Sequence, residues 1–187
     1  LEVHWLEWGA ADAPAVIAWH GLARTCRDMD ELAQHFAARG FRVICPDTRG
    51  HGRSDSPSEP LTMTELAADA ARLIDELAEG ESVIWVGISM GGLIGQELAI
   101  RHPDKVKALV LSNTTSRYSA AGREALGQRI ATVESHGLPA ISTSTMARFF
   151  SEGFRQRRPA VVSCHQRLLE STDPEGYTAC AAALCEA

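Results

Sequence analysis

Short apolar runs alternate with amphipathic stretches along the first 115 residues of the chain. Residues 15–19 form a continuous apolar run that ends at a His-Gly pair, which is typical of a buried strand. Residues 28–39 instead carry apolar side chains at helical spacing, and Gly40 can close that helix. By the same criteria, the pattern predicts further strands over 3–8, 41–45, 82–88 and 106–111 and further helices over 62–78 and 90–102.

The order of these elements indicates the class of fold. Strand and helix follow one another repeatedly, which predicts an α/β protein with a mostly parallel, doubly wound sheet. The helix over 62–78 has a capping box at its start, because Thr62 precedes Glu65 by three residues.

After residue 115 the pattern becomes wholly helical. We expect helices over 120–135, 139–150, 159–170 and 174–185, the last of them started by Asp173 as N-cap and Pro174 at the first helical position. A helical block after a run of strands resembles a lid over a sheet. We therefore expect residues 1–115 to form the N-terminal part of the core, and residues 116–187 to form a helical cap that is incomplete at its end.

Composition narrows the possible partners. The chain has 187 residues, enough for one domain, and a net charge of −6 with scattered Lys and Arg, which argues against nucleic acid. No apolar run approaches the roughly 20 residues that cross a bilayer, so no membrane partner is expected. The five cysteines include no CxxC pair, which indicates reduced thiols in a cytoplasmic protein and no metal site. The chain begins with Leu1 rather than Met, which indicates a trimmed or processed start. The sequence does not determine the oligomeric state.

The residues Gly87-Ile88-Ser89-Met90-Gly91 match the pattern G-x-S-x-G between a predicted strand and a predicted helix. This is the context of a nucleophile elbow, a sharp turn that exposes a serine above the sheet. Gly87 and Gly91 leave room for that turn, and the Met90 backbone N–H at the helix start could stabilise an oxyanion. The alternative is a glycine-rich turn with an incidental serine. We favour Ser89 as the nucleophile.

Two further loops, each after a predicted strand, also contain residues that could take part in chemistry. His20-Gly21-Leu22 lies where a second oxyanion donor is expected, here the Leu22 N–H, and we expect His20 and Gly21 to shape the loop rather than to catalyse. The glycine- and arginine-containing run 47–54 could suggest phosphate binding. It has neither a Walker nor a dinucleotide spacing, so we interpret it as a structural loop.

Together these motifs, with Arg101-His102-Pro103 and the strand that follows, resemble the α/β-hydrolase superfamily over about the first 115 residues. In the helical part, residues 128–133, 149–154 and 173–177 resemble the cap of 3-oxoadipate enol-lactonases. That resemblance implies a cofactor-free serine hydrolase with a Ser-Asp-His triad, acting on a small enol-lactone in aromatic catabolism. The loop at 20–22 is more similar to general esterases and C–C bond hydrolases.

The acid and histidine of the expected triad are not identified in this chain. In the superfamily both follow later strands, and no strand pattern follows residue 115. We therefore expect them outside residues 1–187. Hydrolysis of carboxylic esters or lactones is the leading hypothesis. The alternatives are C–C bond hydrolysis of ring-cleavage diketones, and a hydrolase fold retained for ligand binding without turnover.

Overall fold

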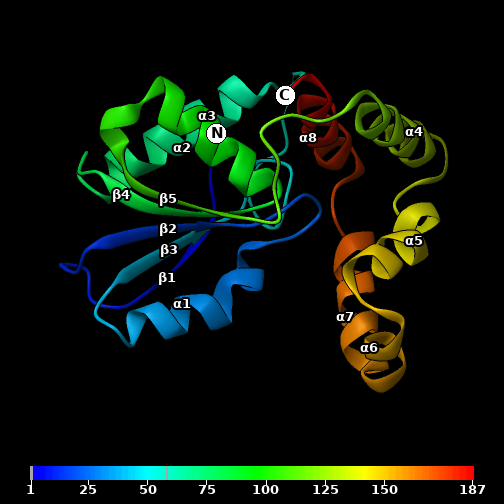
Figure 1. Ribbon diagram of the computed structural model, residues 1–187, viewed down its shortest axis with the longest axis horizontal. Coiled ribbons are helices and arrows are strands. Elements are labelled where there is room, and N and C mark those ends of the chain that lie inside the picture. The colour runs from blue at the N-terminus through cyan, green and yellow to red at the C-terminus, as the bar shows by residue number, and fades with distance from the viewer. Residues whose placement is uncertain (1, 58) are drawn as a thin grey trace.

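A computed structural model describes residues 2–57 and 59–187 and, within them, one sheet with the strand order β1-β3-β2-β4-β5 (Figure 1). The strands are β1 (Trp5–Trp8), β2 (Ala15–Trp19), β3 (Arg42–Pro46), β4 (Val83–Ile88) and β5 (Val106–Ser112). The last four are parallel, and β1 is antiparallel to β3 at one edge. The mostly parallel α/β sheet predicted from the sequence is therefore confirmed.

Helices cover both faces of this sheet. The helix α1 (Asp30–Ala37) lies on one face, and α2 (Met63–Leu77) and α3 (Met90–Arg101) lie on the other (Figure 1). Because successive side chains of a strand point to opposite faces, Val16 packs in the cluster beside α1 and Ile17 packs in the cluster beside α2 and α3. This arrangement explains why the strand sequences are continuously apolar.

The ends of two helices show how local sequence sets their bounds. Thr62 is the N-cap of α2, and the predicted capping box with Glu65 is present. The helix predicted from residue 28 is divided into a short 3₁₀ helix, η1 (Cys26–Met29), and α1. Periodicity does not separate these two kinds of helix, because their apolar residues face the same cluster.

The chain is helical after β5 in the order α4 (Ala120–His136), α5 (Pro139–Phe149), α6 (Glu152–Arg157), α7 (Pro159–Glu170) and α8 (Pro174–Glu186). Four of these helices were expected from the sequence, and Asp173 caps α8 as expected by accepting from the backbone N–H groups of Glu175 and Gly176. The short helix α6 was not expected. Its six residues are too few to show a helical period, and it starts at the Ser151 N-cap.

The helices that follow β5 do not all lie in the same place relative to the sheet. Figure 1 shows α4–α7 beside the sheet, whereas α8 returns toward α2. Cys180, Ala183 and Leu184 of α8 belong to the same apolar cluster as Leu66 of α2. The packing thus crosses the boundary expected at residue 115, and the division into core and cap stays a prediction. Within the described residues, no helix has both the length and the apolar character needed to span a bilayer.

Candidate active site

Ser89 lies at the tight turn between β4 and α3. Its backbone has φ 53° and ψ −111°, a conformation that residues with a side chain rarely adopt. Two hydrogen bonds hold the turn to β5 and the segment after it: Ser89 N donates to the Ser112 carbonyl at 3.0 Å, and Thr114 Oγ1 donates to the Ser89 carbonyl at 2.7 Å. The strained backbone is therefore fixed from a neighbouring strand.

The glycines around Ser89 are needed because backbones pass very close to one another there. A Cβ built on Gly87 would lie 2.2 Å from the Gly91 carbonyl oxygen, and one built on Gly91 would lie 2.4 Å from the Trp19 carbonyl oxygen. Neither distance is compatible with a side chain. Gly87 thus allows the strand and the helix to approach within the elbow, and Gly91 brings the elbow directly against the end of β2, where the loop at 20–22 begins.

The loop after β2 passes beside the serine. A Cβ built on Gly21 would lie 3.9 Å from Ser89 Oγ, so the Gly21 backbone and the side chain of Ser89 are adjacent. Met90 is the first residue of α3, where backbone N–H groups have no partner within the helix. The structure thus brings together the serine and the two segments, at Leu22 and Met90, that the sequence suggested as oxyanion donors.

His20 uses both of its ring nitrogens inside this loop region. Nδ1 donates to the Gly21 carbonyl at 2.8 Å, and Nε2 accepts from the Thr48 backbone N–H at 2.9 Å. Burial lowers the pKa of His20, which favours the neutral ring that these contacts require. Both nitrogens are occupied, which favours the loop-shaping role over proton transfer.

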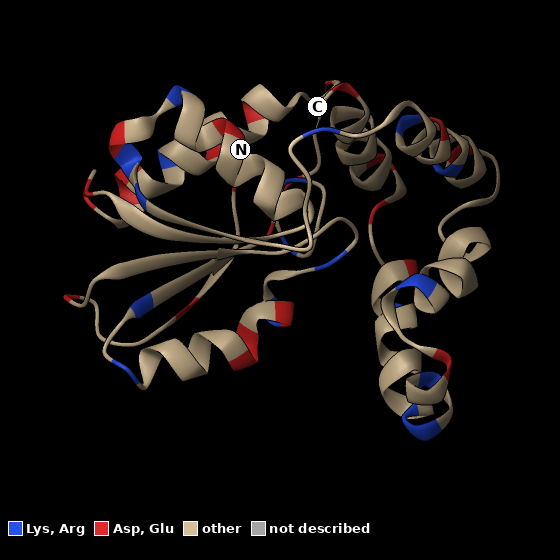
Figure 2. Ribbon diagram, in the orientation of Figure 1, with Lys and Arg blue, Asp and Glu red and all other residues tan. Residues whose placement is uncertain are grey.

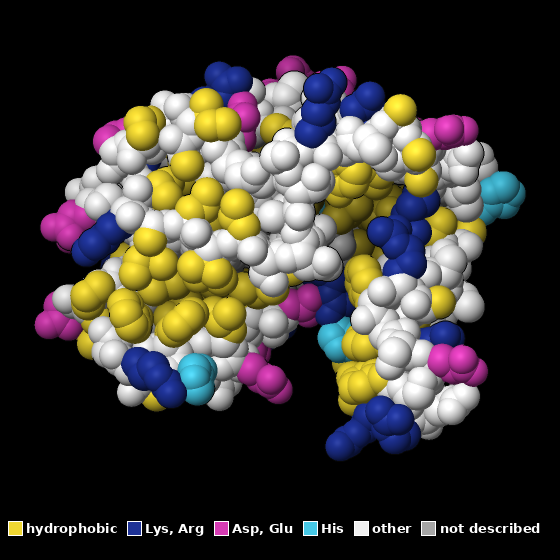
Figure 3. All heavy atoms as spheres, in the orientation of Figure 1, with side chains coloured by type: hydrophobic (Ala, Val, Ile, Leu, Met, Phe, Trp, Pro, Cys, Tyr) yellow, Lys and Arg dark blue, Asp and Glu magenta, His cyan; other side chains and the backbone are white. Residues whose placement is uncertain are grey.

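A cavity of about 670 Å³ lies over Ser89 and between the sheet and the helical block. The core side contributes residues of the loop after β2, and the helical side contributes residues of α4, α5, α7 and α8. Figure 3 shows this hollow between the two parts, with apolar side chains and Lys or Arg side chains along it. Its lining includes Phe149 and Phe150, and also the arginines Arg24, Arg129 and Arg148, which the sequence analysis did not single out. Their irregular spacing along the chain carries no signal that they meet.

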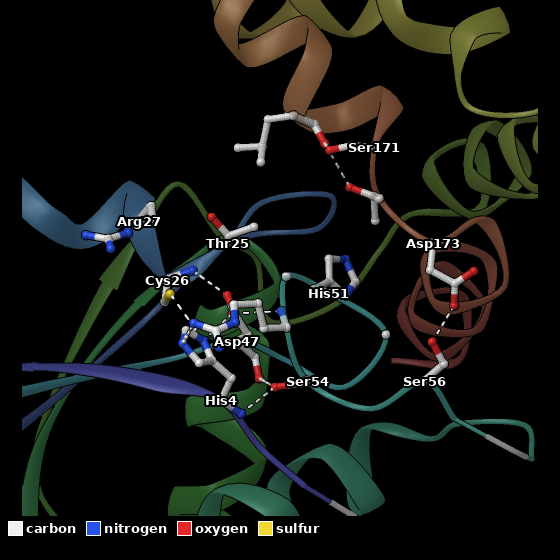
Figure 4. A pocket seen from close by; sticks show the side chains of 15 residues that line it. His4, Thr25, Cys26, Arg27, Asp47, His51, Ser54, Ser56, Ser171 and Asp173 are labelled. Atoms are coloured by element: carbon white, nitrogen blue, oxygen red, sulfur yellow. Dashed lines mark hydrogen bonds and ion pairs between the residues drawn. The ribbon is translucent and has the colours of Figure 1, made fainter.

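The 47–54 loop forms a separate cavity of about 420 Å³, seen in Figure 4. There the buried Asp47 carboxylate accepts from the backbone N–H groups of Cys26 and Arg53, at 2.7 and 3.1 Å, and from His4 Nδ1 at 2.7 Å. Burial alone would raise the pKa of Asp47, but these hydrogen bonds outweigh it and hold that pKa below its usual value. Asp47 therefore ties the residue before β1, the start of η1 and its own loop together.

His4, Cys26 and Asp47 also form the one group of possible metal ligands found in the part of the chain that the structure describes. Figure 4 shows the three side chains converging. The Asp47 oxygens are already hydrogen-bonded, and the Arg53 guanidinium lies 3.2 Å from His4 Nε2. Burial raises the pKa of the Cys26 thiol to about 12, so the thiolate that a metal needs is disfavoured. These contacts favour a structural role for the group.

Comparison with known proteins places this geometry in a family. Residues 14–137 match the family model described as alpha/beta hydrolase fold. The chain is 34% identical over 187 residues to 3-oxoadipate enol-lactonase 2 of Acinetobacter baylyi, covering all of this chain and 68% of that protein. It is 36% identical over 124 residues to the 3-hydroxybutyrate-oligomer hydrolase of Cupriavidus necator, covering 65% of this chain and 42% of that protein.

A solved structure supports the same family assignment as the sequence matches. The enol-lactonase from Burkholderia xenovorans LB400 superposes with a TM-score of 0.92 at 29% identity, covering 99% of this chain and 70% of that one. These relatives are longer than this chain, and they are named as enol-lactonases and an oligomer hydrolase. The chain belongs to the α/β-hydrolase family, and its relatives include 3-oxoadipate enol-lactonases.

Proposed function

We propose that this chain carries the nucleophile and the oxyanion hole of a serine hydrolase that acts on carboxylic esters or lactones. The observation that carries the proposal is the strained backbone of Ser89, between a buried strand and a helix, at the floor of a cavity of about 670 Å³. A strained turn that aims a hydroxyl into a cavity has a cost in stability, which nucleophilic chemistry would explain.

The proposed reaction has two stages. Ser89 Oγ attacks the carbonyl carbon, and the backbone N–H groups of Leu22 and Met90 stabilise the negative charge that develops on the carbonyl oxygen. The alkoxide leaves with a proton, and an acyl-enzyme forms on Ser89. Water then attacks the acyl group and releases the acid.

A base must take the serine proton and pass it to the leaving group. In residues 2–57 and 59–187, no histidine nitrogen is hydrogen-bonded to Ser89 Oγ; His20 and His51 are occupied within the core loops. We therefore propose that the catalytic histidine and its acid lie outside residues 1–187. The greater length of the enol-lactonase relatives supports this.

The proposal predicts that Ser89→Ala in the product of the complete gene lowers hydrolysis of an aryl ester or lactone by at least about 10³-fold, because the acyl-enzyme cannot form. A fluorophosphonate, which loses fluoride to an activated serine, should label the parent protein once, at Ser89. The control is Ser144→Ala, since that exposed serine donates only to the Ile141 carbonyl. Unchanged hydrolysis by Ser89→Ala would refute the proposal.

A further inference from the structure

The Thr114 side chain packs against the turn that carries Ser89. Its hydroxyl donates to the Ser89 carbonyl at 2.7 Å, which is the most favourable distance for an O–H donor. A Cβ built on Gly92 would lie 2.7 Å from Thr114 Cβ and 2.8 Å from Thr114 Oγ1. Gly92 thus leaves the space that Thr114 fills against the first turn of α3.

Two features hold Thr114 in this place just after β5. Asn113 has φ 46°, in the left-handed region that asparagine tolerates, so the chain turns sharply at the end of the strand. On the other side of Thr114, the Thr115 carbonyl accepts from Gln96 Nε2 of α3 at 2.9 Å. The segment after β5 is therefore fastened to α3, and the Thr114 hydroxyl is fixed relative to the elbow.

The carbonyl that Thr114 holds belongs to the same planar peptide unit as the Met90 N–H. The peptide bond is trans, so the carbonyl and the N–H point in opposite directions. The Ser89 carbonyl also accepts from the backbone N–H groups of Gly92 and Leu93, at 3.0 and 3.2 Å. Three donors therefore fix the plane of this peptide and the direction of its N–H, and hydrogen bonds to the carbonyl also polarise that N–H.

The other proposed oxyanion donor is held in the same way. The Gly21 carbonyl belongs to the peptide unit that ends in the Leu22 N–H. It accepts from His20 Nδ1 at 2.8 Å and from the Arg24 backbone N–H at 3.2 Å. Each of the two N–H groups thus has a side-chain donor on the carbonyl of its own peptide unit.

We propose that Thr114 is a positioning residue for the hydrolysis, and that it acts through the Ser89–Met90 peptide by directing the Met90 N–H toward the developing oxyanion. The inference rests on the proposed function, because it concerns the oxyanion hole of that reaction. Thr114 is not among the residues that line the cavity, so it acts without touching the substrate. Loss of its hydroxyl should therefore affect the transition state and leave substrate binding nearly unchanged.

Two substitutions in the product of the complete gene test this role. Thr114→Val keeps the branched shape and removes the hydroxyl, and the Ser89 carbonyl stays satisfied by the N–H groups of α3, so the variant should fold. We expect it to lower kcat for an aryl ester by about 10- to 100-fold with KM within about twofold, a smaller loss than removal of a whole oxyanion donor. Thr114→Ser keeps the hydroxyl and should stay within about threefold of the parent.

The matched control is Thr132→Val. The Thr132 hydroxyl also donates to a backbone carbonyl, that of Gln128 at 2.8 Å, but it lies in α4 and does not line the cavity. This variant should keep the kcat of the parent. Each kcat is expressed per Ser89 titrated with a fluorophosphonate, so that an inactive or unfolded fraction is not counted.

The outcomes separate this inference from the proposed function. An unchanged kcat in Thr114→Val, a loss confined to KM, or an equal loss in Thr114→Ser or in the control would overturn the positioning role. If Ser89→Ala abolishes hydrolysis while Thr114→Val does not lower it, the proposed function stands and this inference alone fails. Hydrolysis that survives Ser89→Ala refutes the proposed function itself.

Discussion

At the scale of single residues, buried polar side chains hold the loops around Ser89 in place. His51 is fully enclosed: its Nε2 accepts from the Ala23 backbone N–H at 3.0 Å, and its Nδ1 donates to the Arg49 carbonyl at 3.3 Å. Burial lowers the pKa of His51 to about 3. A proton on Nε2 would face the Ala23 N–H and break that contact, so the loop that carries Leu22 depends on a neutral imidazole.

This arrangement predicts how stability changes with pH. Because the pKa of His51 is about 3 in the folded protein and about 6.5 in the unfolded chain, protons bind the unfolded chain preferentially between these values. The contribution of His51 is complete above pH 6.5 and is lost as the pH falls toward 3, by up to about 1.4 kcal/mol per pH unit. Urea denaturation from pH 7 to pH 4 measures it. The variant His51→Gln, which keeps an acceptor for Ala23, should show a shallower loss, and a parallel curve would contradict the assignment.

At the scale of elements, the β4–α3 turn depends on close backbone contacts that leave no space for a side chain. Gly91 lies against the carbonyl oxygens of Trp19 and His20, at 2.4 and 2.8 Å from a built Cβ. The contact joins the start of α3 to the end of β2. It therefore sets the separation between the elbow and the loop with Leu22, which the proposed oxyanion hole requires.

We predict that Gly91→Ala destabilises the protein by about 3 kcal/mol or more, since backbone atoms must move to admit the methyl group. Gly127→Ala is the matched control, because Gly127 lies inside α4 with no atom near its built Cβ. In the control the usual preference of helices for alanine should stabilise the protein by about 1 kcal/mol. Thermal unfolding measures both changes, and similar effects of the two substitutions would show that the packing at Gly91 is looser than described.

At the scale of the whole molecule, β5 is an edge of the sheet within the described residues, paired with β4 alone. Its neighbouring residues Val110 and Leu111 point to opposite faces, yet they are 49% and 42% exposed. Figure 3 shows a broad apolar surface over the sheet region of the molecule, whereas Figure 2 shows acidic and basic positions spread over the surrounding helices and loops. An unpaired edge with exposed apolar side chains favours association with other chains.

We therefore predict that residues 1–187 expressed alone associate through this edge at high concentration. Val110→Lys, which places a charge on the strand, should lower light scattering severalfold at equal protein concentration. The comparison variant Val161→Lys changes an exposed apolar residue of α7, away from the sheet, and should leave scattering unchanged. Equal effects of the two variants would indicate that added charge, rather than the edge, controls association.

Much of the architecture follows from local sequence. The strand at 15–19, the Thr62 capping box, the Asp173 cap and the turn around Ser89 are each specified by neighbouring residues, through hydrophobic period, side-chain caps and glycine geometry. These local rules suffice to predict a doubly wound sheet and to single out Ser89. The six-residue helix α6 escapes them because it is shorter than the window in which a period can be recognised.

The surroundings of Ser89 depend on contacts between distant parts of the chain. Arg24 meets His165 across 141 positions, and Cys180 lies beside the 47–54 loop, 131 positions from Arg49. Such pairs depend on how the helices after β5 pack on the core, and no local pattern encodes that packing. The sequence by itself determined the class of fold and the candidate nucleophile. Only the tertiary structure decided which charges line the cavity, because long-range packing brings them together.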